Sequence, residues 1–310
     1  MQPLRKVISK LKLRASYGQV GNANLGGRRF AYLSTITDDY ATLDMYKWGL
    51  DSSYGLTGMA EGEFAVQDLT WEIVNKMNLG VELGFLNGMI DLQLDYFDER
   101  RKDIFMPRES VPMTAGFMKQ PWKNFGKVTN QGVEVTLNVN KQFGKDLFVS
   151  LMGTFTYAHN EITEKDEPSA VVGTNRAETG HPVGQLTGYI AEGLFTADDF
   201  EDVSTGKLKE GIPTQSFVGK LRPGDIRYRD VNGDGKVDVF DKSPIGGTKD
   251  PEIVYGFGVN MKYKNLDFGA LFQGIGRSWN ILGSSIIPGA NRGVTGNMFT
   301  NANDRWTVDN

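Results

Sequence analysis

The chain has 310 residues, with 34 basic and 38 acidic side chains, a net charge of −4 and no cysteine. The lack of cysteine excludes disulfides, zinc–thiolate sites and thiol catalysis, and the slightly acidic balance argues against a nucleic-acid-binding surface. No run approaches the ~20 consecutive apolar residues that a transmembrane helix needs. A transmembrane β-barrel stays open, because its strands are apolar only at alternate positions.

Seven segments alternate apolar and polar residues with a period of two, which predicts β-strands. In chain order they are residues 11–17, 76–85, 90–96, 133–139, 147–157, 253–263 and 266–272. Short connectors follow the second, fourth and sixth segments, so six of the strands form three hairpins. Asn87-Gly88 suits a primed hairpin turn, in which both central residues take positive φ.

The other connectors are long: residues 18–75, 99–130 and 160–252. A compact soluble domain seldom contains such connectors, whereas an outer-membrane barrel has short periplasmic turns and long outer loops. A soluble β-sandwich shows the same alternation, so the period alone does not separate the two folds. Tyrosines near the strand ends on the apolar face favour a barrel with an interfacial aromatic girdle: Tyr17, Tyr96, Tyr157, Tyr255 and Tyr263.

Six motifs, in order along nearly the whole chain, resemble the SusC/RagA family of TonB-dependent outer-membrane transporters. They are residues 11–22 (LKLRASYGQVGN), 68–72 (DLTWE), 78–88 (NLGVELGFLNG), 128–134 (VTNQGVE), 223–228 (PGDIRY) and 304–307 (DRWT). The resemblance implies a large antiparallel transmembrane β-barrel with a plug domain inside it. It also implies a SusD-like surface lipoprotein over the barrel mouth and TonB-powered uptake of glycans or peptides.

Two departures limit what the resemblance carries over. The family's plug and TonB-contacting segments precede the part that matches, and the last barrel strands follow it, so residues 1–310 correspond to a partial barrel. A partial barrel leaves two sheet edges with unpaired backbone groups, which hydrocarbon does not tolerate. We therefore expect that this segment does not span a membrane by itself.

Residues 230–241 (DVNGDGKVDVFD) match a twelve-residue calcium loop. The predicted ligands are side-chain oxygens and one backbone carbonyl, those of Asp230, Asn232, Asp234, Lys236 (carbonyl), Asp238 and Asp241. Asp241 stands where a bidentate Glu is usual. The alternative is a solvated turn, since Asn-Gly and Asp-Gly form turns without an ion. The hypothesis is a structural Ca²⁺ that stiffens this loop.

The location of the calcium loop follows from counting strand directions. The strand that ends near Tyr157 leaves a short turn, and the strand that begins at Ile253 enters one. Residues 160–252 therefore start and finish at the same end of the sheet, which makes this region extracellular in a barrel, provided that an even number of crossings lies within it.

Other chemistry-bearing residues are weak candidates. His159 and His181 are expected in loops and have no serine or carboxylate arrangement typical of a triad. The adjacent carboxylates Asp98-Glu99 and Asp198-Asp199 are expected to be solvated in loops. The aromatic residues in or beside the long connectors either stack on sugars, contact a lid, close over loop cores or lie at the membrane interface: Trp48, Tyr54, Trp71, Trp122 and Trp279. Polar side chains facing the lumen either line a substrate path or hydrogen-bond to a plug: Glu82, Asp91, Gln93, Asp95 and Glu134.

The sequence therefore predicts a non-enzymatic transporter barrel of the outer membrane of a Gram-negative bacterium. Its expected partners are a SusD-like surface lipoprotein, the TonB system, outer-membrane lipid and an oligosaccharide or peptide, with no nucleic acid. The alternative is a secreted, soluble β-sandwich that binds carbohydrate and carries a calcium-stiffened loop. The substrate-binding residues are not identified by the sequence.

Overall fold

The computed structural model describes residues 7–37, 46–48, 54–56, 59–117, 119–282, 300 and 306–307. The chain divides into two compact units. The sheet unit comprises Met1–Val172, Ala177–Val183 and Glu252–Gly276, and the loop unit comprises Gly173–Arg176, Gly184–Pro251 and Arg277–Asn310.

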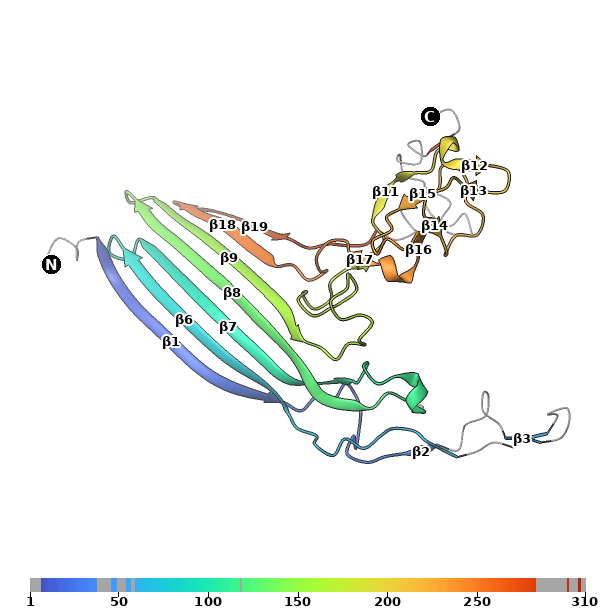
Figure 1. The fold of residues 1–310 in the computed structure, drawn as a ribbon. Helices are drawn as coiled ribbons and strands as arrows, with labels where there is room; N and C mark the ends of the chain where they lie inside the picture. Colours follow the sequence, from blue (N-terminus) through green and yellow to red (C-terminus); the bar gives the residue numbers. More distant parts are fainter. Residues whose placement is uncertain are drawn as a thin grey trace. The chain divides into compact units, whose positions relative to one another are not determined.

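The sheet unit is built on seven antiparallel strands in the order β1-β6-β7-β8-β9-β18-β19. Their bounds are β1 Ile8–Asn22, β6 Glu72–Phe85, β7 Ile90–Pro107, β8 Trp122–Phe143, β9 Leu147–Glu164, β18 Ile253–Tyr263 and β19 Leu266–Gly276. Figure 1 shows these strands as one bent layer. Within the described residues the sheet does not close, so β1 and β19 are its edges.

All seven predicted strands are confirmed, and most of them run further than the alternation indicated. The predicted connector 99–130 is wrong for most of its length, because β7 continues to Pro107 and β8 already begins at Trp122. The reason is that residues 98–102 are charged on both faces of the strand. A strand whose two faces are both polar has no period of two to detect.

The hairpin turns have the expected handedness but not always the expected length. Asn87 and Gly88 both have positive φ, as predicted, but so does Leu86 (φ 52°). This turn therefore spans the four residues 86–89 between β6 and β7. By contrast, Tyr263 pairs directly with Leu266, which makes the β18–β19 connection a two-residue turn.

Short two-stranded pairs make up most of the remaining regular structure. In the sheet unit β2 (Ile36–Thr37) pairs with β5 (Ala60–Glu61) and β3 (Tyr46–Trp48) with β4 (Tyr54–Leu56). In the loop unit the pairs are β10 (Thr187–Gly188) with β17 (Ser243–Pro244), β11 (Ala191–Leu194) with β15 (Ile226–Tyr228), β12 (Phe200–Asp202) with β13 (Lys207–Leu208), and, in parallel, β14 (Thr214–Gln215) with β16 (Lys236–Val237).

Three short 3₁₀ turns are complete within the described part of the chain. They are η2 (Met113–Ala115), η3 (Ala197–Asp199) and η4 (Val239–Asp241). Among the described residues, no helix is both long and apolar enough to cross a membrane.

The hydrophobic core lies in the loop unit rather than under the sheet. Phe195, Phe200 and Leu221 form a buried cluster there, flanked by Leu208, Ile212 and Val218. Along the alternating rows of the sheet, many large apolar side chains stay exposed; Leu13 is 73% and Leu137 39% exposed. A β-sandwich would cover these rows with a second sheet, so the sandwich alternative is wrong.

Candidate functional site

The seven strands pair in register, so that apolar and polar side chains separate onto opposite faces over most of the sheet. One cross-strand row contains Leu13, Val81, Leu94, Val135 and Phe155. The row beside it contains Lys12, Glu82, Gln93, Thr136 and Thr154. We call these sides the apolar face and the polar face.

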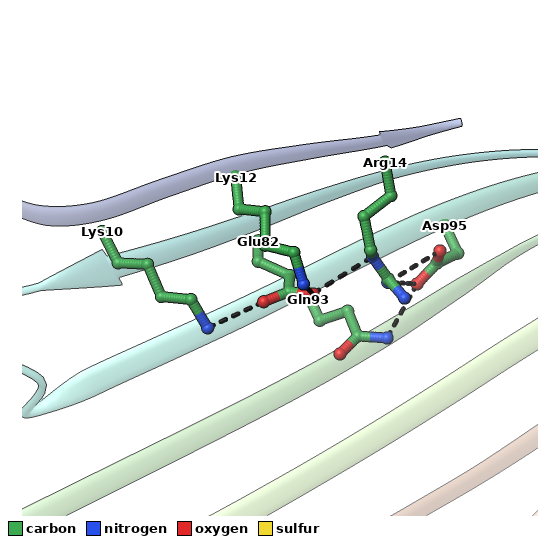
Figure 2. Close-up of polar contacts among 6 residues, drawn as sticks. All are labelled: Lys10, Lys12, Arg14, Glu82, Gln93 and Asp95. Atoms are coloured by element: carbon green, nitrogen blue, oxygen red, sulfur yellow. Dashed lines mark hydrogen bonds and ion pairs between the residues drawn. The ribbon is translucent and has the colours of Figure 1, made fainter. Parts of the chain in front are cut away.

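An ion network occupies the polar face of β1, β6 and β7 (Figure 2). It consists of Lys10, Lys12 and Arg14 from β1, Glu82 from β6, and Gln93 and Asp95 from β7. Glu82 accepts from the Nζ atoms of Lys10 (2.7 Å) and Lys12 (3.1 Å), and the Nε of Arg14 lies 3.1 Å from it. One carboxylate thus holds three cations of the edge strand.

Asp95 is the buried end of this network, with only 6% of its side chain exposed. Its two carboxylate oxygens accept from Nη2 of Arg14 at 2.9 and 2.8 Å, and Gln93 donates to it at 2.9 Å. Arg14 and Gln93 therefore replace the water that this carboxylate loses.

Gly80 makes this contact across two strands possible. Arg14 pairs with Gly80, and Gly80 pairs with Asp95, so the arginine crosses the whole width of β6. A Cβ at Gly80 would lie 2.5 Å from Asp95 Oδ1 and 3.1 Å from Arg14 Nε. Glycine is required here for space, not for a special φ.

The residues predicted to line the polar face are placed there, and three of them belong to the network. Glu82, Gln93 and Asp95 are network members, and Glu134 lies opposite Asp95 on β8. Asp91 lines a small cavity together with Lys10 and Glu82. Sequence reasoning missed the three cations of β1, because their partners are recognisable only from the cross-strand register.

The polar face changes character toward β19. Met152, Gly258 and Leu271 face each other across β9, β18 and β19, and Leu271 is 68% exposed. The charges of the network are therefore concentrated at the β1 side, and a small apolar strip occupies the other side. The alternation analysis did not indicate this strip.

Ion pairs connect β6 and β7 where the two strands continue past the alternating apolar residues. Arg101 contacts Glu72 at 2.5 Å and Lys76 contacts Glu99 at 2.7 Å. Asp98 is nearly buried and accepts from Arg100 and Gln131. The expectation that Asp98-Glu99 is a solvated loop pair is therefore wrong, because both residues are strand residues with cross-strand partners.

The calcium-type loop is folded around its own backbone amides. Asp241 is fully buried, and its Oδ1 accepts from the amide of Val231 (2.8 Å) and its Oδ2 from that of Asp238 (2.7 Å). Asp230 accepts from the amides of Gly233 (2.7 Å) and Gly235 (2.8 Å). The predicted ligands Asn232, Asp234 and Asp238 each accept from an amide two residues further on.

Across the described residues, no group of three or more His, Cys, Asp or Glu side chains is placed to hold a metal ion. A carboxylate has about four lone-pair sites, so accepting one amide at each oxygen still leaves room for a cation. Calcium stays a prediction.

An aromatic cluster lies in the same loop unit. Tyr189 stacks on Phe217 with ring centroids 4.5 Å apart, and Tyr228 contacts both rings. Burial, and then the negative charges of Asp238 and Asp241, raise the pKa of Tyr189. The cluster is therefore electrostatically coupled to the calcium-type loop, a relation that the sequence did not indicate.

Three of the tryptophans singled out in the sequence pack against neighbouring residues. Trp122 packs 5.1 Å from Phe105 and carries Arg28 over its ring, and Trp279 covers Gly246 and Gly247. Trp71 covers Gly21 but remains 64% exposed. The side chains of Trp48 and Tyr54 lie outside the described part of the structure, although their backbones pair between β3 and β4.

The histidines and the second carboxylate pair are also tied locally. His159 was expected in a loop, but it lies in β9 and contacts Glu252 at 2.6 Å. The backbone carbonyl of His181 accepts from Ile162. Asp199 accepts from Thr196 at the start of η3, while Asp198 lies in its first turn.

Residues 4–308 match the family model "TonB dependent receptor-like, beta-barrel". TonB-dependent receptor SusC of Bacteroides thetaiotaomicron is 29% identical over 280 residues, and TonB-dependent receptor P26 of Formosa agariphila is 27% identical over 317 residues. The matches cover 84% and 99% of this chain, but 24% and 29% of those proteins.

Among solved structures, the RagAB peptide importer in the "open-open" state is similar with a TM-score of 0.62 and 22% identity. The match covers 91% of this chain and 27% of that chain, and at this identity it shows the fold alone. These findings confirm the resemblance in the motifs. The chain therefore belongs to the family of TonB-dependent receptor-like β-barrels.

Proposed function

We propose that the whole protein imports an oligomeric nutrient, a glycan or a peptide, across the outer membrane of a Gram-negative bacterium. In this proposal it is powered by TonB and works with a SusD-like surface lipoprotein. The observation that carries the proposal is the single-layer sheet, whose apolar rows meet no second sheet among the residues that the structure describes. Lipid is the apolar medium that such rows require.

The dimensions of the apolar face support this proposal. On β18 the apolar row runs from Ile253 to Tyr263, a stretch of 11 residues. A tilted transmembrane strand needs about 9–11 residues. Tyr255 and Tyr263, near the two ends of this stretch, match the two aromatic girdles of a barrel.

The arrangement of the connections also supports it. No described strand between residues 165 and 252 joins the seven-stranded sheet, so β9 and β18 are neighbours. The long connection thus leaves and re-enters the sheet at one end, and the short turns lie at the other. In our proposal this long end is extracellular, which makes region 160–252 available to the surface lipoprotein.

We assign the polar face to the barrel lumen. A wide barrel must be filled, and an ionic wall suits a plug domain that forms hydrogen bonds and ion pairs. The alternative, that these residues line the substrate path, concerns the same face. Substituting Lys12 and Arg14 by glutamine in the full-length protein separates the two: loosening of the plug, read by cross-linking, supports the first.

The proposal is tested in cells that produce the full-length protein. We expect the protein to fractionate with the outer membrane, and a labelled peptide or oligosaccharide to accumulate only in cells with intact TonB and proton-motive force. Recovery of the full-length protein in the soluble fraction without detergent would contradict the proposal. The family's transport role agrees with the expectation that the chain is not an enzyme.

We propose in addition that residues 230–241 bind a structural Ca²⁺. Five side-chain oxygen donors in twelve residues are hard ligands that suit calcium, and four carboxylates this close repel each other without a cation. Both Gly233 and Gly235 have positive φ, which allows the sharp turn that such a loop needs.

Terbium luminescence and calorimetry on the full-length protein test the calcium proposal. We expect Asp230→Asn and Asp234→Asn to weaken binding at least about tenfold. The matched control is Asp202→Asn, because Asp202 forms a similar turn in the same unit by accepting from Ser204. Equal cation binding in all three variants would place the ion elsewhere and refute the site.

A further inference from the structure

A cavity of about 380 Å³ lies in the first long connection of the sheet unit, where segment 28–35 meets segment 63–66 and β7. Its apolar lining consists of Phe30, Ala31, Leu33, Phe64, Val66 and Phe105. It is lined by none of the predicted calcium ligands and by no member of the ion network. This cavity is therefore separate from the sites described above.

Backbone hydrogen bonds between the two segments hold the cavity wall in place. Val66 donates to Ala31 (2.9 Å), Thr35 donates to Glu63 (3.0 Å) and Gly62 donates to Thr35 (2.7 Å). Phe30 has a φ of 56°. A bulky residue is strained in this left-handed region, and such strain persists only where the surroundings enforce it.

The charged groups beside the cavity leave an excess of positive charge. Glu63 accepts from Lys119 at 2.9 Å and also pairs with Arg28, whose guanidinium lies 4.1 Å from the Trp122 ring centroid. Arg29 lies over the Phe30 ring at 5.5 Å and forms no ion pair among the described residues. One carboxylate is thus shared by two cations, and no described carboxylate pairs with Arg29.

The lining is poorly suited to a sugar. A glycan subsite needs many convergent hydrogen-bonding side chains, whereas this cavity is lined mostly by hydrocarbon. Of its hydroxyl groups, that of Thr35 already accepts from the amide of Glu63 at 2.8 Å. An apolar side chain would bury its surface here without leaving polar groups unpaired.

We propose that this cavity binds an apolar side chain of an oligopeptide and that Arg29 pairs with a carboxylate next to that side chain. The inference rests on the proposed import function and specifies its substrate class. The carboxylate is either the peptide's C-terminus or an acidic side chain, because a guanidinium recognises both in the same way.

Calorimetry on the purified full-length transporter tests this inference directly. Three probes are heptapeptides that end in Phe: one with a free C-terminal carboxylate, one with a C-terminal amide, and one with a C-terminal amide and an Asp next to the Phe. The other two probes are a heptapeptide that ends in Ser and the sugar maltoheptaose. The variants are Arg29→Gln and the cavity-filling Ala31→Phe. Arg176→Gln is the matched control, since Arg176 also lies over a phenylalanine ring, 5.0 Å from that of Phe240.

We expect the Phe-terminated peptide to bind and the Ser-terminated peptide and maltoheptaose to bind at least about tenfold more weakly. Arg29→Gln should weaken binding of the carboxylate-bearing peptides about tenfold, the size of a lost charge-assisted hydrogen bond, and leave the plain amide unchanged. Comparing the affinities of the two amidated peptides, with and without Asp, shows whether Arg29 pairs with an acidic side chain or with the C-terminal carboxylate. Ala31→Phe should weaken all Phe-containing peptides, and Arg176→Gln none.

Unchanged peptide affinity in both Arg29→Gln and a folded Ala31→Phe would overturn the inference. The inference would also be overturned if maltoheptaose bound more tightly than every peptide and Ala31→Phe abolished this maltoheptaose binding. If Ala31→Phe does not fold, Arg29→Gln still tests the inference, because it changes only the charge. A failure of TonB-driven uptake would instead count against the proposed function, because binding is measured on the purified protein.

Discussion

The two units of this chain treat apolar side chains in opposite ways. The loop unit buries Phe195, Phe200 and Leu221 against one another, as a small water-soluble domain does. The seven-stranded sheet carries many more apolar residues, yet most of them have no covering layer. The same hydrophobic effect therefore organises one unit around an interior and leaves the other to an external apolar medium.

This difference makes the two units sensitive to different substitutions. A small core responds to lost volume, because neighbouring side chains cannot refill a cavity. A lipid-facing row tolerates lost volume but not charge.

The largest effect is expected in the core of the loop unit. Phe195 is 1% exposed and lies 5.8 Å from the Phe200 ring, so Phe195→Ala should cost about 3–5 kcal/mol of local stability. Hydrogen exchange of the full-length protein should then speed up in residues 184–251 and not in β6 to β9. Phe217→Ala, which removes a 45% exposed ring, is the control and should change much less; faster exchange in the sheet would contradict the independence of the two units.

The second test places a charge on each face of the same strand. Leu137→Arg on the apolar face of β8 should cost about 2–4 kcal/mol in a bilayer. Its neighbour Asn138→Arg projects from the polar face and should cost far less. Unfolding of the full-length protein from lipid vesicles measures both, and equal costs would rule out a lipid-facing apolar row.

The third test concerns space in the ion network. Gly80→Ala should be destabilising by about 1–3 kcal/mol, because the new Cβ would meet Asp95 and Arg14. Gly153→Ala is the matched control in the same sheet, since a Cβ there has no neighbour within 4 Å, and it should be neutral or slightly stabilising. Thermal unfolding in detergent distinguishes them; a neutral Gly80→Ala would mean that the network is not tightly held.

The smallest effect is a pH dependence outside the apolar rows. Burial alone would raise the pKa of Asp166, but hydrogen bonds from Ser110 and the charge of Arg108 outweigh it and hold the pKa below its ordinary value. A carboxyl with a lowered folded pKa contributes stability above its unfolded pKa of about 3.9 and loses it as the pH falls through the folded value. Protection of the amides of residues 108–117 against hydrogen exchange, relative to the intrinsic rate at each pH, should therefore fall below about pH 4, and Asp166→Asn should show this low protection at all pH values.

The alternation of the sequence predicted the strands well only where the sheet has one apolar face. It located β18 to the residue, from Ile253 to Tyr263. It missed residues 97–107 of β7, where charged residues occupy both faces and ion pairs such as Arg101–Glu72 hold the ladder. A period of two reports unequal surroundings of the two faces, not hydrogen bonding itself.

The sequence by itself determined the fold class, the seven strands, their facing and the family, because alternation and short motifs are local properties of the chain. Only the tertiary structure decided which cation of β1 meets which carboxylate, why Gly80 must lack a side chain, and that segments 28–35 and 63–66 enclose an apolar cavity. These relations join residues tens of positions apart. The cross-strand register that brings them together depends on the whole sheet, and no single segment encodes it.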